Sequence, residues 1–455
     1  MKKKEYDLII IGGRSAGLVA SVAAGAFGAK TALIEKDRLG GECSWTGCVP
    51  SKTLLSAANL AYRTGCQPDQ VMEHVRKTVK KASKASKVKS LLDKYQIDIF
   101  FGAPRFQDNH TLELGGEILK SKKFILCTGS SALVPPIQGL VSGYLTNKEV
   151  WQLPAPPESL LIIGGGPIGT EMAQAFHRLG CKVTIIDGVE RLLSRDDAEL
   201  SKELTELLKK EGIDVQLNFM VKKISRTDQG WEITNKQKTL FGEQLLIALG
   251  RQANTAGLNL EATGISYERE RIKVDRYLHT DAPNIWAAGD CIGGLRFSHT
   301  AEVEAKIAVR NALFPFNSRP DYQGAPWATF TEPELAHLGL TEQECEEKNL
   351  HYQVYYHSFS GDDRAITDGT TEGKVKILAT PFGKILGVHI LGHRAGELMN
   401  EFVLAYRKKM RLHEIGLTIH IYPTLGMALQ RATDQWFSDW AEKSWAKFLF
   451  NIFRR

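Results

Sequence analysis

The chain has 455 residues and a formal net charge of +6, with 43% hydrophobic and 24% charged residues. This composition is that of a globular protein long enough for about three domains, and the charge is too small for this length to indicate a nucleic-acid partner. The seven cysteines are an odd number without the spacing of a secreted disulfide framework, which favours a reducing compartment. We therefore expect a cytoplasmic protein that does not bind nucleic acid.

The N-terminus combines three lysines with an apolar run at residues 8–11. This run of about four residues is shorter than the roughly 7–15 of a secretory signal. No run in the chain approaches the roughly 18 apolar residues of a membrane span. The run therefore predicts a first β-strand over residues 6–11.

The first strand opens a dinucleotide-binding unit. A glycine turn over 12–17, a helix over 16–27 and a strand over 31–35 follow, and the second strand ends in Glu35. In such a unit the helix N-terminus faces the pyrophosphate and the acid accepts hydrogen bonds from ribose hydroxyls. The cofactor-binding residues predicted here are Gly12, Gly13, Ser15, Ala16, Gly17, Glu35 and Lys36.

Arg14 departs from the G-x-G-x-x-G pattern, which has glycine at this position so that the backbone can approach the pyrophosphate. Two explanations are open. Either the side chain turns outward, which we favour, or it adds a direct positive charge to the phosphates.

A second dinucleotide-binding unit has the same order. A strand over 160–163, a glycine turn over 164–169, a helix through 179 and a strand over 182–187 end in Asp187. Two complete units in one chain predict two bound dinucleotides. An acid at this place suits a ribose 2′-hydroxyl and slightly favours NADH, although Arg191 keeps NADPH open. The residues predicted to bind this cofactor are Gly164, Gly166, Ile168, Gly169 and Asp187.

Two cysteines, Cys43 and Cys48, lie five residues apart in the glycine-rich stretch 40–52. This spacing lets one helical turn bring both sulfurs together, so the pair can cycle between dithiol and disulfide. An idle pair or a metal site is the alternative. The position directly after a nucleotide-binding unit, with Lys52 four residues beyond Cys48, favours a redox pair, and we predict no metal site.

The segment that follows is helical to about residue 93 and rich in basic residues. Such a run is usually a solvated helix face, and the alternative is steering of an acidic substrate or partner. Its basic residues are Arg76, Lys77, Lys80, Lys81, Lys84, Lys87 and Lys89.

The second half of the chain continues with a strand that ends at Gly289-Asp290, where the acid could bond a flavin ribityl hydroxyl or cap a helix. From about residue 320 the pattern changes to strands and helices typical of a separate α+β domain. The predicted strands are 352–357, 374–378 and 385–390, and the predicted helices are 396–408 and 427–440.

These motifs together resemble the class I pyridine nucleotide–disulfide oxidoreductases, the family of dihydrolipoamide dehydrogenase, glutathione reductase and mercuric reductase. The cysteine stretch, both nucleotide units, Cys127-Thr128-Gly129, Gly250-Arg251 and Thr280–Asp290 occur in the family's order. The resemblance implies FAD in the first unit and NAD(P)H in the second. It also implies a homodimer in which each C-terminal domain completes the partner's active site. The further cofactor-binding residues that it implies are Gly41, Lys52, Thr128, Gly129, Gly250, Arg251, Gly289 and Asp290.

The predicted fold class is α/β, with two Rossmann-like dinucleotide-binding domains and a C-terminal α+β dimerisation domain. We expect an FAD-binding domain over 1–150 that is completed by 275–318, an NAD(P)-binding domain over 151–274, and a dimerisation domain over 319–433. Residues 434–455 form an aromatic and basic amphipathic tail.

The resemblance also implies individual roles. Cys48 would lie beside the flavin and Cys43 would be the outer sulfur that meets substrate. Lys52 would lie near the flavin N5 atom, paired with Glu171. An ammonium at this place stabilises a reduced flavin and a neighbouring thiolate. For Lys52 and Glu171 taken alone, ordinary surface charges are the alternative.

The segment Thr418–Met427 departs from the family pattern His-Pro-Thr-Leu-x-Glu. Tyr422 stands in place of the histidine and Met427 in place of the glutamate. Tyrosine, with an ordinary pKa of about 10, is a weak base near neutrality. His420 is either a displaced base or a structural residue, and we favour the second. Tyr422, like Pro167 of the second glycine turn, resembles mercuric reductase, although the chain shows neither the C-terminal cysteine pair nor the N-terminal metal-trafficking domain of that enzyme.

The sequence therefore predicts an FAD-dependent NAD(P)H oxidoreductase that passes electrons through Cys43 and Cys48. The acceptor would be a small-molecule or protein-bound disulfide, or a soft metal ion. One alternative is a dihydrolipoyl dehydrogenase that serves a lipoyl protein, and another is a flavin-bound redox sensor.

Aromatic residues in the tail, beginning with Trp436, Phe437 and Trp440, recur at near-helical spacing with basic residues between them. Such a helix can pack on its own dimer, which we favour, or dock on a membrane surface or partner. The further members of the stripe are Trp445, Phe448, Leu449, Ile452 and Phe453.

Overall fold

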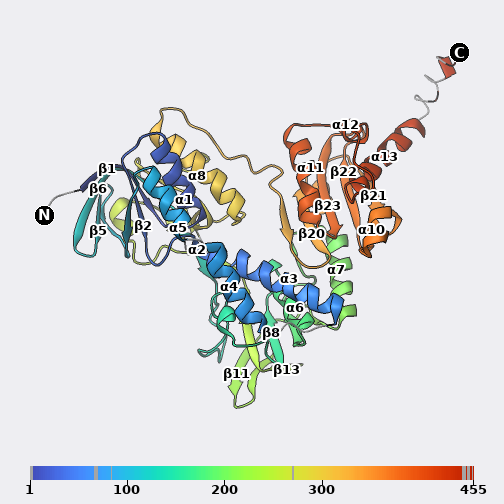
Figure 1. The fold of residues 1–455 in the computed structure, drawn as a ribbon, viewed down its shortest axis with the longest axis horizontal. Helices are drawn as coiled ribbons and strands as arrows, with labels where there is room; N and C mark the ends of the chain where they lie inside the picture. The colour runs from blue at the N-terminus through green and yellow to red at the C-terminus, as the bar shows by residue number, and fades with distance from the viewer. Residues whose placement is uncertain are drawn as a thin grey trace.

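The computed structural model describes residues 4–65, 70–83, 85–268 and 271–442, together with residues 447, 451, 452 and 454. The molecule has three lobes, each built around its own main β-sheet (Figure 1). In the view of Figure 1 the first sheet lies at the left, the second at the bottom and the third at the right. The architecture is therefore mixed α/β, as the sequence predicts.

The first sheet is mainly parallel, and its first strand carries the apolar run of the N-terminus. Leu8, Ile9, Ile10 and Ile11 are all buried, because helices and neighbouring chain cover both faces of a parallel sheet. Small residues let the helices α1 (Ser15–Ala26) and α8 (Ser298–Leu313) share one core against this sheet. The parallel strands are β3 (Asp98–Phe101), β2 (Thr31–Glu35), β1 (Lys4–Ile11), β6 (Glu117–Leu126) and β18 (Ile285–Ala287), and the antiparallel hairpin β4 (Arg105–Asp108) and β5 (Thr111–Leu114) extends the sheet.

The second sheet is parallel throughout and repeats the order strand, glycine turn, helix, strand. Its main helices are α6 (Pro167–Arg178) and α7 (Ala198–Glu211). The strands, in spatial order, are β10 (Asp214–Gln216), β9 (Lys182–Ile186), β8 (Ser159–Ile163) and β14 (Gln244–Ile247). A separate antiparallel sheet of β11 (Lys223–Thr227), β12 (Gly230–Thr234) and β13 (Thr239–Gly242) extends below it in Figure 1. Both dinucleotide-type units thus have the predicted local structure.

The third sheet is antiparallel, and the helices α11 (Ala395–Arg407) and α13 (Met427–Glu442) bury apolar side chains against it. The predicted strands and helices of this region all form, with bounds that differ by one or two residues. The strands, in spatial order, are β19 (Trp327–Thr329), β20 (Glu334–Gly339), β23 (Ile385–Gly392), β22 (Lys374–Ala379) and β21 (Gln353–Ser358).

The remaining elements are short or connect the lobes. The strands β7 (Ser130–Ala132) and β15 (Arg251–Ala253) pair antiparallel between the first lobe and the chain that leaves the second. The others are η1 (Glu149–Gln152), η2 (Leu260–Thr263), β16 (Tyr267–Glu268), β17 (Arg271–Ile272), η3 (Asp290–Ile292), α9 (Glu342–Glu347), η4 (Phe359–Gly361), α10 (Asp363–Asp368) and α12 (Leu412–Gly416).

A buried lysine joins the third lobe to the second. The side chain of Lys376 in β22 is 1% exposed, and its Nζ lies 2.9 Å from Asp197 Oδ2 and 3.0 Å from Glu199 Oε2 at the start of α7. A buried ammonium is stable only with such anionic partners. This contact therefore holds the antiparallel sheet in place against the second nucleotide-type unit.

The cysteine stretch forms two helices rather than one helical turn. Residues Gly41–Trp45 form α2, and α3 (Cys48–Thr64) begins after a break at Thr46 and Gly47. The helix α3 packs against both α4 (Val71–Ser83) and α6, so it links the first and second lobes.

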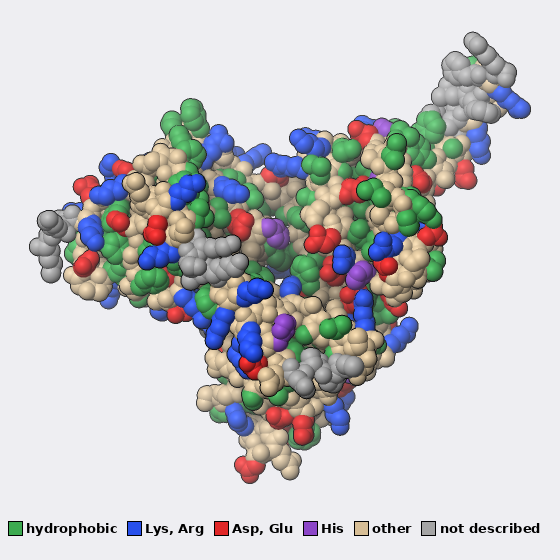
Figure 2. Space-filling model, in the orientation of Figure 1, with side chains coloured by type: hydrophobic (Ala, Val, Ile, Leu, Met, Phe, Trp, Pro, Cys, Tyr) green, Lys and Arg blue, Asp and Glu red, His purple; other side chains and the backbone are tan. Residues whose placement is uncertain are grey.

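The lysine-rich segment forms α4 and α5 (Ala85–Lys94). Lys77, Lys80 and Lys81 are exposed, as predicted for a solvated face, and Figure 2 shows basic side chains gathered over α4. Arg76 is different because its guanidinium donates to the carbonyl oxygen of Leu153 at 3.1 Å. The predictions for Lys84 and for the side chain of Lys87 lie outside the described residues.

The first half of the aromatic tail packs on its own lobe. Trp436 is buried in the core of the third lobe and Phe437 packs against that core. Packing of the tail on a dimer partner stays a prediction. Trp440 and Ile452 are exposed. The predictions for Trp445, Phe448, Leu449 and Phe453 lie outside the described residues. Among the helices that the structure describes, none is both long and apolar enough to cross a membrane.

Candidate active site

A disulfide bond joins Cys43 and Cys48 where α2 meets α3. Their Cα atoms are 4.7 Å apart, within the range of roughly 4.4–6.8 Å usual for disulfides. The other described cysteines are free and buried, namely Cys127, Cys181, Cys291 and Cys345. Burial raises the pKa of the Cys181 thiol to about 12 and that of the Cys127 thiol well above its ordinary value, so these thiols stay protonated. Among the described cysteines, Cys43 and Cys48 are therefore the pair whose geometry suits redox chemistry.

Lys52 lies one helical turn after Cys48 on α3. Its Nζ is 2.7 Å from Glu171 Oε2 on α6, and it lies 4.3 Å from the centroid of the Phe330 ring. Glu171 is buried, and its Oε1 accepts a hydrogen bond from the Phe330 amide at 3.0 Å. The Glu171 carboxylate thus accepts from both donors and pairs with the half-buried Lys52, which needs such a partner. The pairing of Lys52 with Glu171 is present, as the resemblance implies.

The first glycine turn is fixed by Glu35 at the end of β2. The Gly13 amide donates to Glu35 Oε2 at 2.6 Å, and the Asp37 amide donates to Glu35 Oε1 at 2.9 Å. The helix α1 begins at Ser15 without a side-chain cap among the described residues, so its first amide groups can donate to an anion. The other predicted ligands of this unit lie on the turn, in the first turn of α1 and just beyond β2, namely Gly12, Ala16, Gly17 and Lys36.

The second glycine turn has the same geometry. The Gly165 amide donates to Asp187 Oδ2 at 2.6 Å, and the Val189 amide donates to Asp187 Oδ1 at 3.2 Å. Gly166 faces open space, because a Cβ atom built there would meet no atom within 4 Å. The helix α6 again starts without a side-chain cap in the described part of the chain. Gly164, Ile168 and Gly169 complete the turn and the first turn of α6.

Arg191 is engaged by backbone oxygens. Its guanidinium donates to the carbonyl of Ser194 at 2.7 Å, to that of Asp196 at 3.0 Å and to that of Leu193 at 3.3 Å. These bonds direct the guanidinium into its own loop, whereas Asp187 keeps its carboxylate at the glycine turn.

Arg14 turns inward, so the outward orientation favoured from the sequence is wrong. Its Nη1 lies 3.3 Å from Glu42 Oε2 and donates to the Ser130 carbonyl at 3.1 Å. The physical reason is Glu42, whose side chain is 10% exposed and therefore needs cationic partners.

The loops that the resemblance assigns to cofactor binding gather around Asp290. Asp290 Oδ2 accepts a hydrogen bond from Ser130 Oγ at 2.6 Å and lies 3.5 Å from Arg251 Nε. Asp290 opens η3, and Gly289 precedes it with a φ of +80°. Thr128, Gly129 and Gly250 flank this cluster on the adjoining loops.

These groups fit two dinucleotides. FAD carries a pyrophosphate, ribose and ribityl hydroxyls and a flavin ring. The uncapped α1, Glu35, Asp290 and Lys52 offer donors, acceptors and a cation suited to each part. The uncapped α6, the open space at Gly166 and Asp187 suit a nicotinamide dinucleotide in the same way.

Tyr422 and His420 bond within their own lobe. The Tyr422 hydroxyl donates to Asp363 Oδ2 at 3.0 Å, and this bond raises the pKa of Tyr422 above its ordinary value. His420 lies with Nε2 2.8 Å from Glu401 Oε1 and Nδ1 2.8 Å from the Thr418 carbonyl. Burial opposes the imidazolium, but these two bonds outweigh it and raise the pKa of His420. No hydrogen bond among the described residues connects either side chain to the disulfide.

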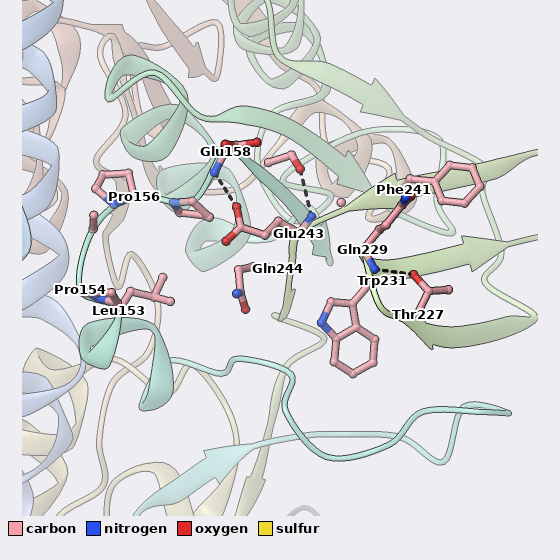
Figure 3. A pocket seen from close by; sticks show the side chains of 14 residues that line it. Leu153, Pro154, Pro156, Glu158, Thr227, Gln229, Trp231, Phe241, Glu243 and Gln244 are labelled. Carbon is pink, nitrogen blue, oxygen red and sulfur yellow. Dashed lines mark hydrogen bonds between the residues drawn. The ribbon is translucent and has the colours of Figure 1, made fainter.

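A cavity of about 720 Å³ lies on the second lobe. The linker from Leu153 to Ser159 and the strands β12 and β13 line it, with Glu243 accepting from the Glu158 amide at 2.8 Å (Figure 3). It contains neither cysteine nor histidine, so it is distinct from the redox site. No group of three or more His, Cys, Asp or Glu among the described residues could hold a metal ion.

Three residues of the site escape prediction from the sequence. Glu42 stands between Gly41 and Cys43, where an acid beside a redox cysteine is a visible signal. Ser130 follows the Thr128-Gly129 motif and could have been included with it. Phe330 gives no signal, since it reaches Glu171 only through folding.

Two family models match the chain. The model described as pyridine nucleotide-disulphide oxidoreductase matches residues 6–305, and the model of the dimerisation domain of the same family matches residues 325–433. Dihydrolipoyl dehydrogenase from Bacillus subtilis (strain 168) is 35% identical over 464 residues, covering 94% of this chain and 97% of that protein. Mercuric reductase from Bacillus cereus is 33% identical over 447 residues, covering 94% of this chain and 71% of that protein.

Solved structures agree. The HOCl-induced flavoprotein disulfide reductase RclA from Escherichia coli has a TM-score of 0.88 at 29% identity, covering 94% of this chain and 99% of that one. Its Cu(II) complex matches equally well, with 96% and 100% covered. Together with the disulfide and the two glycine turns, these matches show that the chain belongs to the FAD-dependent pyridine nucleotide-disulphide oxidoreductase family.

Proposed function

We propose that the protein takes electrons from NADH and passes them through the Cys43–Cys48 disulfide to a soft metal ion or a disulfide, with the metal ion favoured. The observation that carries the proposal is the disulfide itself, with the ion pair of Lys52 and Glu171 one helical turn from Cys48. A structural disulfide would need no paired ammonium one helical turn away.

The chemistry assigned to the protein is a two-electron exchange. Bound FAD would supply the two-electron chemistry that links the nicotinamide to the disulfide. Cleavage of the S–S bond consumes these two electrons and yields two thiolates, which protons neutralise in part. The Lys52 ammonium favours the thiolate of Cys48, and Cys43 presents the outer sulfur to the acceptor.

The choice of a metal ion rests on Tyr422. Its hydroxyl is bonded to Asp363, and its raised pKa makes it a poor base for a thiol substrate near neutrality. His420 is held by Glu401 instead of substituting for the missing base. Two thiolates are natural ligands of a soft ion and need no such base. A mercuric reductase and a protein solved as a Cu(II) complex are among the relatives. The two electrons reduce one ion by two units or two ions by one unit each.

The choice of NADH rests on the second glycine turn. In dinucleotide-binding units an acid at the position of Asp187 binds the ribose 2′-hydroxyl, and it would repel a 2′-phosphate. Arg191, the nearest cation that could favour NADPH, is engaged by three carbonyl oxygens.

We also infer a homodimer through the third lobe. Leu417, Ile419, Ile421 and Phe382 are 73%, 96%, 79% and 74% exposed, which is unusual for large apolar side chains on a free surface. The match to the dimerisation domain supports a second copy as the cover. The proposed boundaries are 1–150 with 275–318 for FAD, 151–274 for NADH and 319–433 for the dimer contact.

The test is a parallel acceptor screen with purified, FAD-loaded protein. NADH consumption is followed with Hg(II), Cu(II), lipoamide, glutathione disulfide and a quinone. Turnover with the metal ions that is lost in Cys43→Ser supports the proposal. Turnover with lipoamide alone would make the protein a dihydrolipoyl dehydrogenase, and no turnover with any acceptor would favour a redox sensor.

A spectroscopic experiment tests the disulfide separately from the acceptor. Reduction by NADH should produce a long-wavelength absorbance from contact between a thiolate and the flavin. Cys48→Ser should lack this band, whereas Cys43→Ser, whose Cys48 cannot form the disulfide, should show it without any reduction. Persistence of the band in Cys48→Ser contradicts the assigned order of the two sulfurs.

A further inference from the structure

The acid next to the outer cysteine has partners from three distant parts of the chain. Glu42 Oε2 pairs with Arg14 Nη1 at 3.3 Å and with the Arg251 guanidinium. Glu42 Oε1 accepts a hydrogen bond from Asn147 Nδ2 at 2.8 Å. Arg14 precedes α1, Arg251 begins β15 and Asn147 precedes η1. A single carboxylate on the short helix α2 therefore ties that helix to three other elements.

The packing of Arg14 is specific to this arrangement. A Cβ atom on Gly41 would lie 2.4 Å from Arg14 Cγ, and one on Gly129 would lie 3.2 Å from Arg14 Cδ. The side chain thus lies directly across two glycines. Arg14 itself has an ordinary φ of −92°, so the residue replaces the glycine of the pattern without backbone strain.

The same network reaches the loop of Asp290. Arg251 Nε donates to Ser130 Oγ at 2.7 Å, and Ser130 Oγ donates in turn to Asp290 Oδ2 at 2.6 Å. The side chains of Arg14, Glu42, Arg251 and Asp290 are between 10% and 29% exposed. Two cations and two anions are therefore balanced in a partly buried volume, where charges interact more strongly than in water.

We propose that Glu42 is a positioning residue of the redox centre, which fixes α2 and Cys43 to the first glycine turn, and that Arg14 neutralises Glu42 so that the Cys43 thiolate forms near neutral pH. The inference rests on the proposed redox role of Cys43. It assigns to Arg14 a function that the glycine of the pattern could not perform.

Whether each variant favours or disfavours the Cys43 thiolate follows from the charges that lie near it. A carboxylate beside a cysteine disfavours the thiolate, whereas a neighbouring cation favours it. With Arg14 present, Glu42 has two cationic partners and its effect on Cys43 is compensated. Without Arg14, one cation remains and the carboxylate acts more strongly on the adjacent thiol. Removing the charge of Glu42 should instead favour the Cys43 thiolate.

The experiment measures alkylation of Cys43 by iodoacetamide as a function of pH in the chemically reduced, FAD-loaded protein, with mass spectrometry to identify the modified residue. Arg14→Gly, Glu42→Gln and the double variant are compared with wild type. Lys122→Ala is the matched control, because Lys122 forms an exposed ion pair with Asp7 at 2.9 Å in the same lobe.

Arg14→Gly should raise the apparent alkylation pKa and slow alkylation at pH 7 by about threefold or more. Glu42→Gln should accelerate it, and the double variant should return to within about twofold of the rate of Glu42→Gln. Lys122→Ala should behave as wild type. The proposal is overturned if Glu42→Gln leaves the profile unchanged, or if the double variant is as slow as Arg14→Gly.

FAD retention during dilution gives a second readout that needs no turnover. Arg14→Gly should release FAD faster than Lys122→Ala does, since it removes a cation beside the first glycine turn. Equal release in both variants counts against the placement of Arg14. Both measurements use neither NADH nor an acceptor, so their outcome is distinguishable from that of the acceptor screen, which tests the proposed function.

Discussion

The Lys52 ammonium and the Glu171 carboxylate lie 2.7 Å apart across the contact between α3 and α6. Lys52 belongs to the helix that begins with Cys48, whereas Glu171 belongs to the helix that begins at the second glycine turn. This ion pair therefore connects the disulfide of the first lobe to the second glycine turn. The Phe330 amide, which also binds Glu171, adds the start of the third lobe to the same contact.

Glu171→Gln should impair the redox centre while keeping its shape. The amide preserves the volume but leaves the half-buried Lys52 without an anionic partner, which changes the charge felt by Cys48. We expect the rate of NADH oxidation to fall about tenfold, the equivalent of about 1.4 kcal/mol in the barrier. Stopped-flow measurement of flavin reduction and turnover checks this. The control is Glu73→Gln, which removes a solvent-exposed ion pair with Lys77, and a rate in Glu171→Gln within twofold of this control contradicts the prediction.

Tyr422→His should increase disulfide reduction. Histidine has an ordinary pKa of about 6.5, and a positioned general base typically contributes about 10²–10⁴-fold. We expect lipoamide reduction to rise at least about tenfold, with a pH profile that follows a group near neutrality. Tyr422→Phe is the matched control and should show no gain. If Tyr422→His shows none either, the shape of the site excludes these substrates.

Asp187→Ser should shift the nucleotide preference. Wild type should use NADH with a kcat/KM at least about tenfold above that for NADPH, because the Asp187 carboxylate repels a 2′-phosphate. The serine variant removes this charge, so the ratio should fall towards one. Steady-state kinetics with both nucleotides checks it. Arg191→Ala should leave the ratio unchanged, because the guanidinium serves its own loop, and a fall in NADPH use in that variant contradicts the assignment.

Asp196→Asn should remove a pH-dependent loss of stability. Burial raises the pKa of Asp196 from about 4 to about 7, while its Oδ1 accepts a hydrogen bond from Trp327 Nε1 at 2.9 Å. The protonated acid therefore stabilises the fold at low pH, and this contribution is lost as the pH rises from about 4 to 7. The neutral amide retains the acceptor without the charge.

Thermal unfolding between pH 4 and 8 measures this effect. The difference in midpoint temperature between Asp196→Asn and wild type should increase as the pH rises and level off above about pH 7. At that plateau the difference should correspond to at most about 4 kcal/mol in the free energy of unfolding. The exposed Asp228 provides the control variant Asp228→Asn, for which the difference should stay flat. A constant difference for Asp196→Asn would show that Asp196 remains ionised in the folded protein.

The two nucleotide-binding units could be predicted because their signal is local. Each is a buried apolar strand, a glycine turn and a small-residue helix within about 30 residues, and strand pairing and helix packing follow from that order. The acids Glu35 and Asp187 follow from the same order, since Glu35 ends β2 and Asp187 directly follows β9, each beside its own glycine turn. The cysteine pair could be predicted in the same way. The structure differs in one respect, because the two cysteines lie where the helices α2 and α3 meet and not within one helical turn.

The environment of that pair could not be obtained locally. Glu42 and Arg14 are 28 residues apart, and Glu42 and Arg251 are 209 apart, so no periodicity connects them. Nor does spacing show that His420 pairs with Glu401, 19 residues away on α11. The partner of a partly buried charge is an opposite charge that lies close to it in the folded chain, because desolvation makes an unpaired ion costly.

The sequence by itself thus determined which chemical groups are available to this protein: two glycine turns each followed by an acid, a cysteine pair, and a tyrosine where the family pattern has histidine. Short-range steric and hydrogen-bonding rules are sufficient for that, since glycine turns and buried strands act within one segment. Only the tertiary structure decided how the charges around the disulfide are compensated. It turned Arg14 inward to Glu42, and it joined Lys52 to Glu171 across two lobes, because electrostatic balance in a partly buried site depends on which distant segments pack together.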